Sequence, residues 1–239
     1  MRPTFRPLPA FTPYIVVTVV HLIAIAVGGD DLVAATKPLL MPALLIGLVL
    51  GLPVRRSMLI VWGGLALVFS WLGDVLLQSP GEIGFLIGMG AFGLAHLAYI
   101  ALYLGPLRTR RVPWWGIALA VAWWAALVAL LAPNLGALLI PVAVYGLVLG
   151  TAAATALGTT RLIAIGAGVF LVSDTLLGLD RFLPSFSFGA VDLLIMLSYC
   201  LGQGLIIAGV VTVARRRAGF ANAGQLTPAT TALEHPGSI

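Results

Sequence analysis

Charged residues are scarce in this chain of 239 residues, where Asp, Glu, Lys and Arg together make up only 9%. Soluble globular domains carry about 25% charged and roughly 45–50% apolar residues. This chain is 61% hydrophobic and has a mean hydropathy of +1.11. The composition therefore excludes both a soluble globular domain and a disordered chain. Because the apolar runs are long and do not alternate with polar residues, they indicate an all-α integral membrane protein.

Cysteine and histidine are also rare. Cys200 is the one cysteine, so the chain can form neither an intrachain disulfide nor a multi-thiolate metal site. The three histidines, His21, His96 and His235, are too few for a zinc centre, and we expect no metal and no other cofactor. The net charge of +5 is explained by arginines in the loops, so we do not expect a nucleic-acid partner.

Eight apolar segments are long enough to cross a bilayer as helices, which takes about 20 residues each. The predicted spans are residues 12–28, 33–51, 57–78, 83–105, 113–132, 135–155, 160–178 and 190–213. Residues 1–213 thus form one predicted transmembrane domain. Residues 214–239 are polar and have no apolar period, so we predict a disordered cytoplasmic tail there.

The positive charges are distributed unevenly between the predicted loops. With the N-terminus inside, eleven of the 13 Lys and Arg residues lie on the inner side. These are Arg2, Arg6, Arg55, Arg56, Arg108, Arg110, Arg111, Arg161, Arg215, Arg216 and Arg217. Lys37 and Arg181 lie toward the outer side. Because cytoplasmic loops are enriched in Lys and Arg, we expect a protein of the cytoplasmic membrane with both termini in the cytoplasm.

Two pairs of short segments recur at nearly one offset along the chain. Residues 42–51 resemble residues 141–150 at an offset of 99, and residues 73–77 resemble residues 173–177 at an offset of 100. Each pair lies four spans apart, so both copies have the same orientation in the membrane, as in a parallel repeat. The pattern favours two four-helix halves, 1–106 and 107–213, over chance similarity in a Leu- and Gly-rich chain.

Polar residues inside the predicted spans are the functional candidates, because a charge at the bilayer centre costs at least about 2.5–3.5 kcal/mol. Asp74 and Asp174 are the catalytic candidates. The supporting candidates are Lys37, His96, Tyr99, Tyr199 and Gln203. Counted from the inner arginines at about 1.5 Å per residue, all of these candidates except Tyr99 lie within about 10 Å of one another in depth. We therefore expect one polar cavity, in the outer half of the membrane, to hold them all.

The alternative interpretations differ between these residues. A structural pair with Lys37, or a hydrogen bond between helices, is the alternative for Asp74 and Asp174. Lys37 can instead extend its ammonium group to the outer interface. His96 and Tyr99 share one helical stripe, as do Tyr199 and Gln203. For Tyr99, simple packing is the competing interpretation.

Five short motifs occur in an order and spacing that are similar to one known family. They are TKPLL at 36–40, GDVLL at 73–77, FGLAHLAYI at 92–100, GAGVFLVSD at 166–174 and SYCLGQ at 198–203. Over residues 12–213 the chain resembles the YhhN-like lysoplasmalogenase family of multi-pass membrane proteins. The resemblance implies an eight-helix hydrolase whose substrate is a lysophospholipid, a lysoplasmalogen. Such an enzyme cleaves the vinyl ether bond to release a fatty aldehyde and a glycerophospho-headgroup, with Asp74 and Asp174 as the essential pair.

Vinyl ether hydrolysis needs an acid to protonate the alkene carbon and a carboxylate to stabilise the resulting cation or to activate water. Two carboxyl groups in different environments can divide these roles, as they do in glycoside hydrolysis. The sequence alone leaves open which aspartate is the acid. A proton-coupled transporter that uses Asp74 and Asp174 is the main alternative, favoured if Pro42 and Pro141 break their helices. A lipid-binding membrane protein without catalytic activity is the third.

Overall fold

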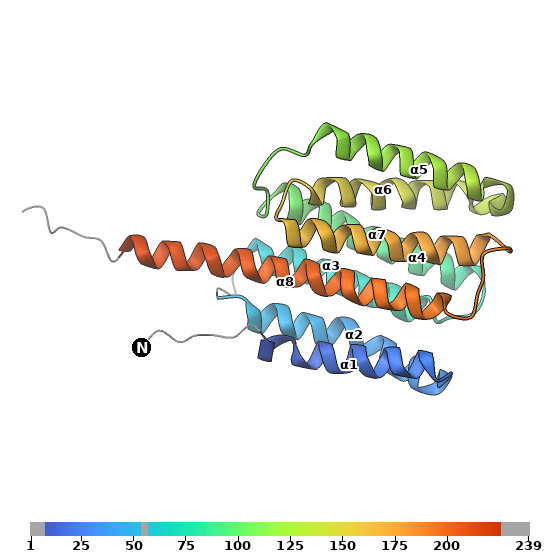
Figure 1. Ribbon diagram of the computed structural model, residues 1–239, viewed down its shortest axis with the longest axis horizontal. Coiled ribbons are helices and arrows are strands. Elements are labelled where there is room, and N and C mark those ends of the chain that lie inside the picture. The colour runs from blue at the N-terminus through green and yellow to red at the C-terminus, as the bar shows by residue number, and fades with distance from the viewer. Residues whose placement is uncertain (1–7, 54–56, 226–239) are drawn as a thin grey trace, which may run out of the picture.

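The computed structural model describes residues 8–53 and 57–225, and every regular element in these residues is a helix. Eight α-helices and one short 3₁₀ turn follow in order (Figure 1). They are α1 (Leu8–Ala26), α2 (Asp30–Gly51), α3 (Met58–Leu76), α4 (Glu82–Leu104), α5 (Trp114–Leu135), η1 (Gly136–Leu138), α6 (Leu139–Ala156), α7 (Arg161–Phe182) and α8 (Val191–Gln225). The all-helical fold class predicted from composition is confirmed for this part of the chain.

By length and composition, seven segments are apolar enough to cross a membrane, where the sequence predicted eight. The difference lies in residues 114–156, which form one apolar stretch of 43 residues. Within this stretch the helical path turns at Gly136, whose φ of +51° is in the left-handed region that glycine adopts without strain. The break was predicted at Pro133, but Pro133 lies inside α5. In Figure 1, α5 and α6 run side by side as a hairpin.

Two predicted boundaries near the C-terminus differ from the structure. The predicted span 160–178 ends too early, because α7 continues through Phe182. The boundary of the predicted tail at residue 214 falls inside α8, which continues as a helix to Gln225. The rest of that tail, including His235, lies outside the described residues, as do Arg2, Arg6, Arg55 and Arg56.

Six of the helices form a closed ring in which each contacts the next. The order around the ring is α2, α3, α4, α6, α7, α8 and back to α2. The other two helices lie outside it, α1 against α2 and α8, and α5 against α6 and α7 (Figure 1). One further contact, between α3 and α8, crosses the ring. The ring therefore surrounds an interior that six helices can line.

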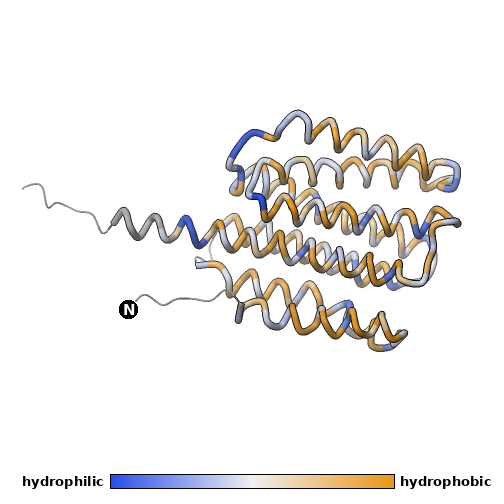
Figure 2. Tube along the Cα trace, viewed as in Figure 1, coloured by the Kyte–Doolittle hydropathy of each residue, from blue (hydrophilic) through white to orange (hydrophobic). Residues whose placement is uncertain are grey.

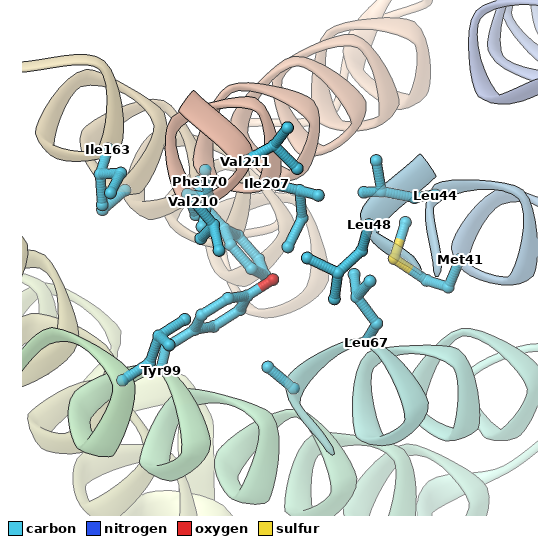
Figure 3. Close-up of a cluster of buried hydrophobic side chains, with 14 of the residues drawn as sticks. Met41, Leu44, Leu48, Leu67, Tyr99, Ile163, Phe170, Ile207, Val210 and Val211 are labelled. Carbon is cyan, nitrogen blue, oxygen red and sulfur yellow. The ribbon is translucent and has the colours of Figure 1, made fainter. Parts of the chain in front are cut away.

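Apolar side chains cover the outer faces of the bundle, as expected for a protein surrounded by lipid. Large apolar side chains such as Ile23, Leu97 and Ile165 are exposed on its outer faces. A soluble monomer rarely exposes so much apolar surface, whereas lipid accommodates it. The core is also apolar: Leu44, Leu48 and the α8 valines pack around Tyr99 and Phe170 (Figure 3). The few buried polar groups form the hydrogen bonds between helices and the polar part of the candidate site.

A missing hydrogen bond in α2 is replaced by a bond from α3. Pro42 has no N–H to donate to the carbonyl of Pro38, four residues earlier. The indole Nε1 of Trp71 donates to that carbonyl oxygen at 3.0 Å. In lipid an unsatisfied carbonyl is costly, so this bond stabilises the joint between the two helices. It also fixes the neighbours of both partners, Lys37 on α2 and Asp74 on α3.

The closest helix approach, between α7 and α8, depends on two glycines. A Cβ atom at Gly166 would lie 2.8 Å from the backbone nitrogen of Ile206, and one at Gly202 would lie 2.8 Å from that of Phe170. Only the absence of a side chain allows the two backbones to come this close, as at other small-residue contacts between membrane helices. This approach brings the central part of α8, including Tyr199, next to Phe170.

Arginines cap helix ends at one end of the bundle. The guanidinium of Arg215 donates to the carbonyl of Gly51, that of Arg217 to Pro106, and that of Arg110 to Leu157, at 2.6–2.8 Å. These carbonyls lie at the C-terminal ends of α2, α4 and α6, where unpaired carbonyls and the helix dipole favour cations. Figure 2 shows hydrophilic segments at this end and a mainly hydrophobic bundle between the ends.

Substituting Gly166 by alanine should destabilise the fold, because the new Cβ would overlap backbone atoms of α8. Overpacking of this kind costs typically 1–3 kcal/mol, so we expect the Tm in detergent to fall by several degrees. Gly168→Ala on the same helix is the matched control. A Cβ there meets no atom within 4 Å, and alanine favours a helix by about 0.5–1 kcal/mol. Equal Tm values for the two variants would contradict the proposed contact.

Candidate functional site

A cavity of about 100 Å³ lies among the helices of the ring and extends to α5, which packs outside the ring. Seven helices contribute to its lining, from α2 to α8. Most of the lining is apolar, with Met89, Leu127, Leu149 and Ile195 among its members. The polar side chains in the lining are Lys37, Asp74, Trp123, Tyr145, Ser173, Asp174 and Tyr199. The cavity has room for several water molecules, and its polar groups are held by helices that are far apart in the sequence.

Asp74 lies in the last turn of α3 and is only 2% exposed. The hydroxyl of Tyr199 on α8 donates to its Oδ2 atom at 2.8 Å. Gly73, beside it, leaves space for the ring of Phe92, since a Cβ would lie 2.4 Å from that ring. Phe92 in turn packs edge to face on Tyr199. These contacts fix both the carboxyl group and its hydrogen-bond donor.

Asp174 lies on α7 and is only partly buried. Its Oδ2 atom accepts a hydrogen bond from the hydroxyl of Tyr145, which comes from α6. The residue before it, Ser173, is buried and donates to the carbonyl of Ile195 at 2.9 Å, which links α7 to α8. One turn of α5 approaches the same region, where Trp123 donates to the hydroxyl of Thr175 at 3.2 Å. Each aspartate therefore has its own tyrosine, and the two tyrosines come from different helices.

Lys37 supplies the positive charge in the lining of the cavity. Its side chain is half-buried, and it lies within electrostatic range of Asp74. Asp74 and Asp174 are also close enough to interact electrostatically with each other. The cavity thus combines two carboxyl groups with one ammonium group in an apolar surrounding, where charges interact more strongly than in water.

A second polar cluster includes Tyr99, which lies in the buried apolar core of Figure 3. The hydroxyl of Tyr99 donates to Oε1 of Gln203, whose Nε2 atom donates to the hydroxyl of Ser70 at 3.0 Å. All three groups are buried and come from α4, α8 and α3. Neither Tyr99 nor Gln203 lines the central cavity. Their bonds join three helices of the ring, which is a structural role.

His96 also lies away from the central cavity. Its Nδ1 atom is 2.7 Å from the carbonyl oxygen of Phe92, and its ring packs on Phe170. Its Nε2 atom is buried and has no hydrogen-bond partner among the described residues. His96 contacts the ring of Tyr145 at a centroid distance of 5.8 Å, so it lies behind one of the cavity tyrosines. A separate space of about 10 Å³ is lined by His96, Tyr99 and Tyr103.

The structure thus brings together four of the seven residues predicted for the site. Lys37, Asp74, Asp174 and Tyr199 share the cavity. The expectation of one shared cavity is wrong for His96 and Gln203, which lie outside the lining and contact other helices. Tyr99 lies outside the lining as well. Sequence reasoning missed Tyr145. Its signal was a lone hydroxyl-bearing aromatic in an apolar span, a group that needs a polar partner when it is buried.

The fold and the cavity define a class: an all-helical, multi-pass membrane protein with a pair of intramembrane carboxyl groups. Comparison with family models then gives the particular family. The model of the YhhN family matches residues 32–210, about three quarters of the chain, and the chain belongs to that family. The matched region contains all the polar residues of the cavity lining.

Curated relatives are similar over part of the chain. Proteins named lysoplasmalogenase from Mycobacterium bovis and Mycobacterium tuberculosis are each 40% identical over 154 residues, covering 60% of this chain and 58% of theirs. A lysoplasmalogenase from Rattus norvegicus is 33% identical over 150 residues, covering 59% of this chain and 62% of its own. The chain therefore matches about three fifths of the length of these relatives. No solved structure matches it.

Replacing Gln203 by leucine should destabilise the bundle, since the buried hydroxyls of Tyr99 and Ser70 would lose their partner. Leaving a buried polar group unsatisfied costs about 1–3 kcal/mol. Tyr99→Phe removes one side of the same network, so the double variant should be less destabilised than the sum of the single variants. Unfolding of the four proteins in detergent measures this coupling. Strictly additive losses would show that the Tyr99–Gln203 bond contributes nothing.

Proposed function

We propose that this protein is a membrane hydrolase that cleaves the vinyl ether bond of lysoplasmalogen-type lysophospholipids. The observation that carries the proposal is the pair Asp74 and Asp174, which line one apolar cavity and each bind a different tyrosine. The names of the curated relatives add the reaction and the substrate class. The products would be a fatty aldehyde and a glycerophospho-headgroup, with one water consumed.

The reaction needs little more than a proton donor, a negative charge and water. One aspartate transfers a proton to the alkene carbon that does not carry oxygen. The resulting oxocarbenium-like cation is stabilised by the other carboxylate, which also takes a proton from the attacking water. The hemiacetal then collapses: its hydroxyl returns a proton to the first aspartate, while the second aspartate gives the proton taken from water to the glycerol oxygen, which leaves as the alcohol. A pair of carboxyl groups performs the equivalent steps on a glycosidic bond.

The remaining polar residues of the cavity support these steps. Tyr199 and Tyr145 orient the carboxyl groups that accept their hydrogen bonds. Lys37 either balances the charge of Asp74 or binds the phosphate of the substrate. His96, Tyr99 and Gln203 act from outside the cavity, by holding Tyr145 and the ring of helices in position. No step requires a metal or another cofactor.

The proposed topology has eight spans, with α5 and α6 crossing separately. Both pack as antiparallel neighbours, and each has a length of 18 residues or more. The described arginines near the ends of α4, α6 and α8 lie on one side of the bundle. By the positive-inside rule this side is cytoplasmic. Both termini are then cytoplasmic, and the protein lies in the cytoplasmic membrane.

Helix pairing supports a duplication of four helices. The contacts α1–α2, α2–α3 and α3–α4 have counterparts in α5–α6, α6–α7 and α7–α8. The contact α2–α8, which joins the proposed halves, has its counterpart in α6–α4. This is the pattern of a parallel repeat about an axis along the membrane normal. The halves are residues 1–106 and 107–213, and Asp74 and Asp174 are equivalent positions in them.

The proposal of a hydrolase is favoured over a proton-coupled transporter by the helices themselves. Transporters often bind their substrates where helices are broken. Here α2 is continuous through Pro42, and α6 is continuous through Pro141. The prolines at equivalent positions therefore give no support to transport. A role in lipid binding alone leaves the paired carboxyl groups without a purpose, and their burial is costly.

The first test uses purified protein in detergent with an alkenyl lysophospholipid and its saturated alkyl ether analogue. We expect release of fatty aldehyde from the alkenyl lipid alone, because the alkyl ether has no double bond to protonate. Aldehyde is measured directly as product. Binding or transbilayer movement of either lipid without release of aldehyde would overturn the hydrolase and favour the transporter or the lipid-binding protein.

Replacing either aspartate by asparagine should abolish turnover while preserving the shape of the side chain. Loss of a general acid or base lowers kcat by typically 10²–10⁴-fold. The Tm in detergent should change little, since the amide oxygen can still accept the hydrogen bond of Tyr199 or Tyr145. Aldehyde release and thermal unfolding are measured on the same preparations. An active Asp74→Asn or Asp174→Asn variant would remove that residue from the mechanism.

The Tyr145→Phe variant tests the residue that only the structure identified. Loss of its hydrogen bond to Asp174 should lower kcat by about tenfold, which corresponds to the net value of one hydrogen bond to a charged group. Tyr103→Phe is the control, because Tyr103 is also a buried tyrosine, stacks on Tyr99 and lies outside the cavity lining. Equal activity of both variants would contradict a role for Tyr145.

A further inference from the structure

The lining of the central cavity extends to the end of the bundle at which α4 begins and α7 ends. Phe85, in the first turn of α4, and Phe182, the last residue of α7, both belong to it. Their rings meet edge to face with centroids 5.6 Å apart. Both side chains are only partly buried. This aromatic pair is therefore one place where the cavity lining reaches partly exposed side chains.

A cation lies directly beside this aromatic pair. The guanidinium carbon of Arg181 is 5.1 Å from the centre of the Phe85 ring, which is within the range of a cation–π contact. Arg181 is exposed, in contrast to its neighbour Phe182. The contact with Phe85 holds its charge at the outer end of the cavity, while its N–H groups stay available to an anion.

Arg181 also lies on the face of α7 that carries the catalytic aspartate. It follows Asp174 by seven residues, two helical turns, so the two side chains leave the helix in nearly the same direction. Leu177 and Gly178, between them, line the cavity. The separation along the axis is about 10 Å. Asp174 and Arg181 thus mark the inner and outer points of one stripe along the cavity.

Arg181 differs in position from the other arginines of the described residues. Arg108, Arg110 and Arg111 follow α4, Arg161 begins α7, and Arg215–217 lie near the end of α8. All of these belong to the opposite end of the antiparallel bundle. Three of them bind carbonyls at helix ends, which explains their presence there. Arg181 also lies in the last turn of α7, where the helix dipole favours a cation, but its guanidinium packs on the Phe85 ring instead of on a helix-end carbonyl.

We propose that Arg181 binds the phosphate group of the substrate at the outer end of the cavity. This assignment rests on the proposed function, and it makes the preferred substrate an anionic phosphodiester lysolipid rather than a neutral alkenylglycerol. Arginine suits this task because its planar N–H fork matches the oxygens of a phosphate. Lys37, near Asp74, then serves to balance the carboxylate instead of binding the phosphate.

The distance between the vinyl ether and the phosphate of the substrate is compatible with the distance between Asp174 and Arg181. About six covalent bonds separate the ether-bearing vinyl carbon from phosphorus, a distance on the order of 7 Å. With the vinyl ether beside Asp174, the phosphate lies a little more than one turn of α7 nearer the outer end, and the long side chain of Arg181 covers the remaining distance. The hydrocarbon chain then contacts the apolar lining, including Met89 and Leu127.

The experiment compares two substrates that differ only in the phosphate headgroup: an alkenyl lysophospholipid and the corresponding 1-alkenylglycerol. For the wild-type protein, KM should be lower for the phosphorylated substrate. Arg181→Gln should raise that KM about 10–100-fold, the effect of losing a charged hydrogen-bonded pair. Its kcat, and its KM for the alkenylglycerol, should stay unchanged. Arg181→Lys should retain part of the preference.

Arg161→Gln is the matched control, since Arg161 is an exposed arginine at the other end of α7. Should Arg181→Gln fail to fold, Arg181→Met keeps the aliphatic stem against Phe85 and removes only the charge. An active enzyme whose KM ratio for the two substrates is unchanged in the Gln or Met variant overturns the assignment of Arg181 alone. No aldehyde from the wild-type protein overturns the proposed function and this assignment with it.

Discussion

A carboxyl group that is buried among apolar helices must find hydrogen-bond donors within the protein, and this requirement organises the interior of the bundle. Asp74 on α3 obtains its donor from α8, and Asp174 on α7 obtains its donor from α6. The first bond joins helices that are distant in sequence, and the second joins two consecutive helices. The close approach of α7 and α8 at Gly166 and Gly202 follows the same logic, because it brings Tyr199 into the interior of the ring.

Much of this arrangement could be predicted from the sequence. Asp74 and Asp174 stand out because charges are rare in long apolar runs, and the lengths of those runs gave most helix boundaries to within a few residues. Depth along a helix also follows from counting residues. What counting does not give is the direction of a side chain relative to helices whose neighbours are unknown. His96, Tyr99 and Gln203 face contacts outside the central cavity for that reason.

Tyr145 illustrates the complementary difficulty. It lies within the repeated segment 141–150, but an aromatic residue in an apolar span resembles ordinary packing. Only the pairing of α6 with α7 shows that its hydroxyl reaches Asp174. For a similar reason, the turn that lies at Gly136 was wrongly predicted at Pro133. In soluble proteins a proline usually ends or kinks a helix. A membrane helix can continue through a proline when a neighbouring group hydrogen-bonds to the freed carbonyl, as Trp71 does to the carbonyl of Pro38.

The departure from symmetry between the proposed halves is what gives the two aspartates unlike surroundings. Tyr99 and Tyr199 are separated by 100 residues, as are Asp74 and Asp174. A strictly symmetric pair would have Tyr199 on Asp74 and Tyr99 on Asp174. Instead Tyr99 binds Gln203, and Asp174 takes its donor from Tyr145.

These unlike surroundings bear directly on how two carboxyl groups can divide a reaction. Asp74 is buried, with Lys37 in electrostatic range, whereas Asp174 is partly exposed and borders the apolar stripe that ends at Arg181. Two identical carboxyl groups would compete for the same role. Acid and base functions separate only when the environments differ, so the different partner of Tyr99 matters to the proposed chemistry as much as the two aspartates do.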